Sequence, residues 1–240
     1  MNMKLILVGV LLAAGAARAE LPPEIVRAIH EANKDSVLMI SGTVKFQTQK
    51  LHEIQVAGPA TVVDTNGLLI TSASTVRLPM STRKTEIRES TLKVKLPSGV
   101  ELPVRVVLTD ADLGAVLLAP EQPGAVPAGA FKPGNWDTAT KAQQLDPVVI
   151  VGRTEKAYGG LPDSAPGKIN AVDRKPRLLY ICALLASGDG EAAFDRAGKL
   201  LGVGIGAQTI VAAEELQDVI EQARRAAAKS DMKKLMAAKE

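Results

Sequence analysis

The sequence predicts an all-β protein of two barrel-like halves, with one short helix before the first half and one helix after the second. Three features of its 240 residues lead to this prediction. Short runs rich in Val, Ile, Leu and Thr follow one another with clear turn sequences between them, these runs form two blocks of similar size, and a stretch rich in Pro and Gly separates the blocks. Many short strands at regular spacing favour a pair of small barrels over a parallel sheet.

The first block begins after a predicted amphipathic helix over residues 22–30. Prolines open this segment, and apolar residues recur at helical spacing within it. Turn sequences then divide the block, with Thr65-Asn66-Gly67 closing one hairpin and Pro97-Ser98-Gly99 another. The predicted strands of this block are 37–46, 60–64, 68–71, 91–96, 101–108 and 115–118.

The second block follows a stretch whose composition breaks regular structure. Residues 121–135 are predicted to link the two halves, so the first half covers 20–120 and the second 136–210. From Val211 apolar residues recur every three or four positions, which predicts a terminal helix, and the Lys-rich end from Lys229 is expected to be a solvated tail within the final segment 211–240. The predicted strands of the second block are 147–151, 167–172, 177–184, 191–195 and 200–205.

The N-terminal segment 1–19 has the three parts of a secretory signal peptide. Lys4 provides the charged start, an apolar run follows, and Ala17-Arg18-Ala19 offers a small-x-small cleavage site. The apolar run is too short for a permanent membrane anchor. We therefore expect a periplasmic or secreted protein that is cleaved near Ala19.

Composition narrows the classes of partner. Cleavage removes two of the 29 basic residues and none of the 26 acidic ones, which leaves a net charge of about +1. Such a weak charge gives little steering toward phosphate, and with 2% aromatic residues the chain has few rings for bases to stack on, so a nucleic-acid partner is not expected. No later segment is long and apolar enough for a membrane span. Cys182 stands alone in an apolar run, which excludes an intramolecular disulfide and indicates a buried thiol.

Three sequence blocks resemble the trypsin-like (HtrA/Deg-type) serine protease family. The run Gly58-Pro59-Ala60-Thr61-Val62-Val63-Asp64-Thr65-Asn66-Gly67-Leu68-Leu69-Ile70-Thr71-Ser72 is similar to the strand and hairpin that lead to the family's catalytic histidine. Asp112-Leu113-Gly114-Ala115-Val116-Leu117 resembles the block that carries its aspartate, and Ser187-Gly188-Asp189-Gly190-Glu191 resembles its nucleophile loop. The order of the blocks implies the family's fold, a double six-stranded β-barrel.

The chain departs from the family at two catalytic positions. Counting from Thr71, the histidine position holds Ser74, and counting back from Gly198, the nucleophile position holds Asp189. Only Asp112 keeps the expected residue type. A serine triad needs a hydroxyl nucleophile, an imidazole that takes and returns its proton, and a carboxylate that orients the imidazole. The degenerate triad therefore predicts an inactive protein, and an acidic side chain beside the former oxyanion loop of Ser187, Gly188 and Asp189 adds to the defect.

The resemblance still implies a cleft that holds an extended peptide as an added strand, because strand addition does not need the triad. The residues that would line it are Ala183, Leu184, Val203, Gly204 and Ile205, and barrel core is an equally good interpretation of them. Three alternatives stay open. The protein could be an active endopeptidase with an unrecognised catalytic arrangement, for which Ser187 is the hydroxyl nearest in sequence to Asp189. It could be a purely structural periplasmic domain. It could also use Asp112 and Asp189 as a carboxylate pair that faces across Ser74 and activates water or binds a metal ion. Two carboxylates without a third ligand make a poor metal site, so neither a metal nor another cofactor is expected, and the oligomeric state is left open.

Overall fold

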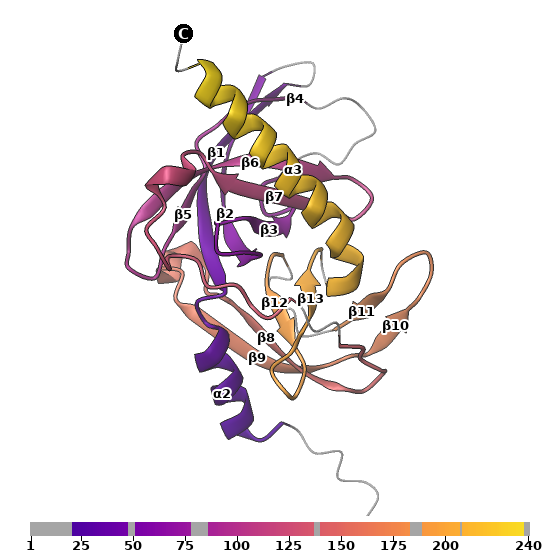
Figure 1. Cartoon of the computed structure of the whole chain (residues 1–240). Helices are drawn as coiled ribbons and strands as arrows, with labels where there is room; N and C mark the ends of the chain where they lie inside the picture. Colours follow the sequence, from indigo (N-terminus) through magenta and orange to yellow (C-terminus); the bar gives the residue numbers. More distant parts are fainter. Residues whose placement is uncertain are drawn as a thin grey trace, which may run out of the picture.

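The computed structural model describes residues 21–47, 51–77, 86–136, 140–182, 189–206 and 208–237. Within these ranges the backbone alone is described for 46–47, 51–52, 86–89 and 233–237. The predicted signal peptide lies outside the described residues. Two antiparallel sheets make up most of the structure, and one helix flanks each end (Figure 1).

The first sheet closes into a barrel. Its strands follow the order β2-β3-β7-β6-β5-β1, and β1 pairs again with β2 over Val37 to Gln47, while β4 extends the sheet beside the end of β1. Alternating apolar residues point into the barrel and fill it. The bounds are β1 (Val37–Gln47), β2 (Leu51–Val62), β3 (Leu69–Ser72), β4 (Glu86–Ser90), β5 (Lys93–Lys95), β6 (Glu101–Asp110) and β7 (Ala115–Pro120).

The second sheet curls without closing in the described part of the chain. Its order is β10-β11-β14-β13-β12-β8-β9, so β9 and β10 form its two edges. Together the two sheets confirm the predicted double-barrel fold. The bounds are β8 (Pro147–Arg153), β9 (Pro162–Lys168), β10 (Ala171–Asp173), β11 (Leu179–Ile181), β12 (Ala192–Phe194), β13 (Leu200–Gly204) and β14 (Thr209–Ala212).

The segment between the sheets packs onto both of them. It contains one short 3-10 helix, η1 (Pro123–Ala125), and a second one, η2 (Lys156–Tyr158), lies in the β8–β9 connection. Phe131 is 1% exposed within the core of the first barrel, and Trp136 donates from Nε1 to the carbonyl of Val62 at 3.0 Å. The linker is therefore anchored by aromatic side chains.

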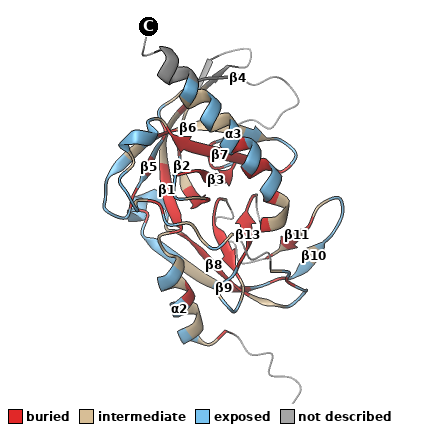
Figure 2. Ribbon diagram, viewed as in Figure 1, coloured by how far each residue is buried: buried red, intermediate tan, exposed pale blue. Residues whose placement is uncertain are grey.

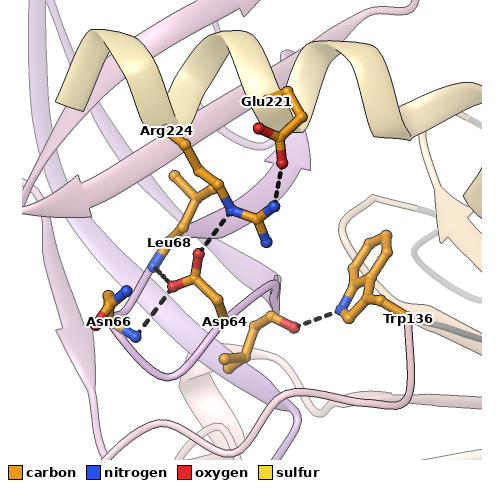
Figure 3. A network of polar contacts seen from close by, with 7 residues as sticks. Asp64, Asn66, Leu68, Trp136, Glu221 and Arg224 are labelled. Atoms are coloured by element: carbon orange, nitrogen blue, oxygen red, sulfur yellow. Dashed lines mark hydrogen bonds and ion pairs between the residues drawn. The ribbon is translucent and has the colours of Figure 1, made fainter. Parts of the chain in front are cut away.

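The long C-terminal helix α3 (Ala213–Ala237) follows β14 and crosses from the second sheet to the outside of the first barrel (Figure 1). Asp64 in the β2–β3 hairpin accepts a hydrogen bond from Nε of Arg224 at 3.2 Å, and Arg224 also pairs with Glu221 (Figure 3). Further along, Arg105 of β6 pairs with Asp231 at 2.6 Å. The helix thus continues past Lys229, where the sequence predicts a solvated tail, and Asp231 in this part pairs with Arg105 of the first barrel.

A shared apolar core joins the two halves. Val63, Ile70 and Leu117 of the first half pack with Val203 and other buried residues of the second half and of α3. These buried segments run through the middle of the molecule (Figure 2). Because the halves share this cluster, the segments that meet at their junction have fixed relative positions.

The N-terminal helix α2 (Pro23–Asn33) lies against β8 and β9. Just beyond its end, Arg153 donates from Nε to the carbonyl of Val37 at 2.6 Å and from Nη2 to the carbonyl of Lys34 at 2.8 Å. Burial lowers the pKa of the Arg153 guanidinium, with the charge of Asp35 opposing that effect. The ordinary arginine pKa is so high that the group stays charged at neutral pH, and it fixes α2 to the second sheet.

Candidate functional site

Ser74 lies in the turn that follows β3, on the first-barrel side of the junction. Its hydroxyl donates to Oδ2 of Asp189 at 2.5 Å, and its oxygen is 2.6 Å from the hydroxyl oxygen of Ser72. Since the single proton of Ser74 goes to the carboxylate, Ser72 is the donor in the second contact. The result is a chain of hydrogen bonds from Ser72 through Ser74 to Asp189.

Asp189 belongs to the second half, where it lies three residues before strand β12. Its other carboxylate oxygen, Oδ1, accepts a hydrogen bond from the backbone amide of Gly206 at 2.9 Å. The hydroxyl of Thr75 lies 3.3 Å from the carbonyl oxygen of Asp189. One carboxylate therefore joins the turn after β3 to the segment after β13. We call the group Ser74, Asp189 and Gly206 the carboxylate bridge.

Gly190 fixes the backbone next to the carboxylate bridge. Its amide donates to the carbonyl of Gly204 at 2.7 Å, and its carbonyl accepts from the hydroxyl of Thr61 at 2.9 Å. Gly190 has φ +91°, and a Cβ added there would lie 2.1 Å from the carbonyl oxygen of Pro59. The close approach of the two halves thus requires glycine at this position.

Asp112 does not join the bridge. It lies in the turn between β6 and β7 with a side chain that is 86% exposed, and its nearest cation is Arg177, whose Nη2 is 3.9 Å from Oδ2. The carboxylate of the neighbouring Asp110 accepts the backbone amide of Leu113 at 2.8 Å. The structure thus gives no support to the alternative in which Asp112 and Asp189 face each other across Ser74, because the Asp112 side chain points into solvent.

The remaining predicted site residues fall into two groups. Ala183, Leu184, Ser187 and Gly188 lie outside the described residues. Val203 is fully buried, and Gly204 has its amide bonded to Glu191 and its carbonyl to Gly190, so both belong to the sheet and its core. Only Ile205 lines an open cavity.

That cavity, which we call the cleft cavity, measures about 500 Å³, and Ile205 in its wall directly precedes Gly206 of the carboxylate bridge. Its apolar wall includes Leu113 of the first half together with Leu179 and Ile205 of the second, and Asp112 and Arg177 stand at its charged end. A concave, mostly apolar surface with few polar groups is typical of a binding site. The cavity can therefore receive an apolar side chain.

Neither of the two histidines has a described side chain near the carboxylate bridge. His30 lies in α2 on the outer side of the second sheet, and for His52 only the backbone, in the long strand β2, is described. Among residues whose side chains are described, no group of three or more His, Cys, Asp or Glu is arranged to hold a metal ion. In the same part of the chain, no helix has the length and apolar composition needed to cross a membrane.

Two members of the site were not predicted from the sequence, Ser72 and Gly206. Ser72 is the last residue of the apolar strand β3, and its position two residues before Ser74 is the one sequence feature that indicates a contact between the two side chains. Gly206 contributes only a backbone amide, and no sequence pattern reports which amide a distant carboxylate will reach.

Comparison with known proteins identifies the family. No curated protein matches the chain in a sequence search. The family model described as a trypsin-like peptidase domain matches residues 58–203, which is more than half of the chain and includes β3, Ser74, Asp112 and Asp189. The chain therefore belongs to the trypsin-like peptidase domain family.

Proposed function

We propose that this protein is a catalytically inactive member of its family that binds extended polypeptide segments in the cleft between its two halves. The observation that carries the first part is the carboxylate bridge. Asp189 occupies the nucleophile position, and its two oxygens are bonded to Ser74 and Gly206. An ionised carboxylate only accepts hydrogen bonds, and both of these donors are engaged with it.

The bridge lacks an imidazole base and has no hydroxyl at the nucleophile position, and acyl transfer needs both. Ser74 cannot take a proton near neutral pH as imidazole does, and its own proton is directed at Asp189. The negative charge of Asp189 opposes any oxyanion that develops nearby. In triad proteases the loss of the nucleophile or the base costs on the order of a millionfold in turnover. Exposed Asp112 offers no compensation.

The cleft cavity supports the second part of the proposal. Its apolar wall of Leu113, Leu179 and Ile205 suits a large apolar side chain of a peptide. The amide of Gly206 is next in sequence to Ile205 of that wall, and Asp189 holds it. A peptide that pairs with this amide must displace the Asp189 carboxylate, so the bridge weakens binding of its own ligand.

A binding experiment tests this function. We expect fluorescein-labelled unfolded casein to bind the purified mature protein saturably, and Leu179→Lys to weaken the affinity at least tenfold because it places a charge in the cleft cavity. Val100→Lys is the matched control, since Val100 is 48% exposed on another hairpin. We expect Asp189→Ala to tighten binding several-fold by freeing the Gly206 amide.

Thermal unfolding of each variant confirms that affinities are compared between folded proteins. Arg177→Trp, at the rim of the cavity, offers a second block that leaves the apolar wall intact. Binding that none of these cleft variants changes, or no binding at all, would contradict a peptide site in the cleft and favour a purely structural role.

We infer further that the protein is exported and cleaved after Ala19. Leu21 supports this position because it is 7% exposed and packs with Ile29 and Val149 in the core of the second half. Cleavage after Ala19 keeps Leu21, whereas cleavage a few residues later removes part of that core. Mass spectrometry of the protein from a periplasmic fraction should give Glu20 as the first residue, and an intact Met1 there would contradict export by cleavage.

A further inference from the structure

A cavity larger than the cleft cavity lies outside the cleft. It is a groove of about 880 Å³ between α2 and the edge strand β9, and we call it the α2–β9 groove. Its walls are mostly apolar, with Val26 on the helix side and Pro147, Pro162 and Pro166 on the sheet side. Helix α2 buries only Ile29, and Val26 and His30 are half-buried, so the side that carries them stays partly open.

Basic residues dominate the charge of this groove. Arg27 and Lys168 both line it, both are exposed, and neither forms an ion pair with a described residue. Its one acidic residue, Asp163, accepts the backbone amide of Ser164 at 2.7 Å. His30 adds an imidazole whose buried Nδ1 has no hydrogen-bond partner among the described residues. The groove is therefore complementary to an anion.

The edge of β9 is unsuited to a peptide strand. In the register of β8 and β9, Val149 pairs with Pro166 and Arg153 with Pro162. Proline has no N–H to donate to β8, so Pro162, Pro166 and the residues at the same alternation direct their backbone polar groups away from the sheet. Ser164 belongs to the same set, and its outward amide is taken by Asp163. Three successive outward positions therefore offer no free donor, which blocks strand addition.

From these observations we infer that the α2–β9 groove binds a monomeric organic anion with an unbranched apolar chain, such as a medium-chain carboxylate. The seven residues of β9 span about 20 Å at roughly 3.3 Å per residue, which accommodates an extended chain. The volume falls within the range of small-molecule sites, about 300–1,000 Å³. The prolines and Val26 contact the chain, and Arg27 and Lys168 attract the carboxylate. This inference does not depend on the proposed function of the cleft.

Isothermal titration calorimetry with monomeric dodecanoate tests the inference on the mature protein. We expect saturable one-to-one binding, a loss of at least tenfold in affinity for the double variant Arg27→Glu/Lys168→Glu, and a similar loss when Val26→Trp fills the groove. The matched control is Lys95→Glu/Arg225→Glu, which makes the same change in net charge at exposed residues of β5 and α3.

Several results would overturn the inference. Dodecanol that binds as tightly as dodecanoate would show apolar adsorption without anion recognition. Equal binding by the groove variants and the control would place the ligand elsewhere. Binding to vesicles of anionic lipid but not to monomeric dodecanoate would identify a membrane surface as the partner. Thermal unfolding of each variant separates loss of the site from loss of the fold.

Discussion

Gly190→Ala is expected to lower the free energy of unfolding by about 3 kcal/mol or more, the sum of a steric and a conformational cost. A methyl group at this position would lie 2.1 Å from the carbonyl oxygen of Pro59 and 2.6 Å from the hydroxyl oxygen of Thr71. The carbonyl belongs to strand β2 and cannot rotate away, so the two halves must separate to admit the methyl group. The φ of +91° adds strain for any residue with a Cβ. Urea unfolding measures the loss.

Gly198→Ala is the matched control for this substitution. Gly198 also has a positive φ, +75°, but the nearest atom to its added Cβ is 3.8 Å away. Its cost is therefore the conformational part alone, about 1–2 kcal/mol. Equal losses for the two variants would mean that the halves do not meet closely at Gly190.

Phe131→Ala is expected to cost about 3–5 kcal/mol, the usual range for a buried phenylalanine. The ring is 1% exposed and belongs to the core cluster of the first barrel, and a Cβ at Gly67 would lie 2.5 Å from it. Such tight packing leaves little room for the surroundings to collapse into the cavity. Denaturant unfolding again gives the change.

The control for Phe131 is Tyr158→Ala, which removes another aromatic ring at a position that is 71% exposed. We expect it to change stability by less than about 0.5 kcal/mol. A small effect at Phe131 would show that the linker does not take part in the core of the first barrel.

Most strands could be predicted because their residues alternate between core and surface or are wholly apolar. The sequence predicts only the last two residues of strand β9 as a strand, because Pro162–Lys168 contains two prolines and a glycine and no apolar run. For strand β14 (Thr209–Ala212) the sequence predicts a helix from Val211 onward, since the short apolar run of the strand continues into the helical pattern. An edge strand and a strand fused to a helix are both stabilised by neighbours that local sequence does not reveal.

The site was predictable only in part. The spacing from Thr71 and from Gly198 identified Ser74 and Asp189 as the two positions, and the structure brings their side chains together. The orientation of Asp112 was not predictable. Because position 74 holds no imidazole, the Asp112 carboxylate has no imidazole N–H from which to accept a hydrogen bond. It is hydrated in solvent instead. The contact of Asp189 with Gly206 depends on how the two halves meet, which no local pattern encodes.

The most direct test of catalytic inactivity is labelling of the purified mature protein with a fluorophosphonate probe, beside an active trypsin-like protease and with cleavage of unfolded casein as a second readout. Because Asp189 holds the nucleophile position and Ser74 the position of the base, we expect neither labelling nor cleavage. A labelled serine, together with casein cleavage that the probe abolishes, would contradict that expectation.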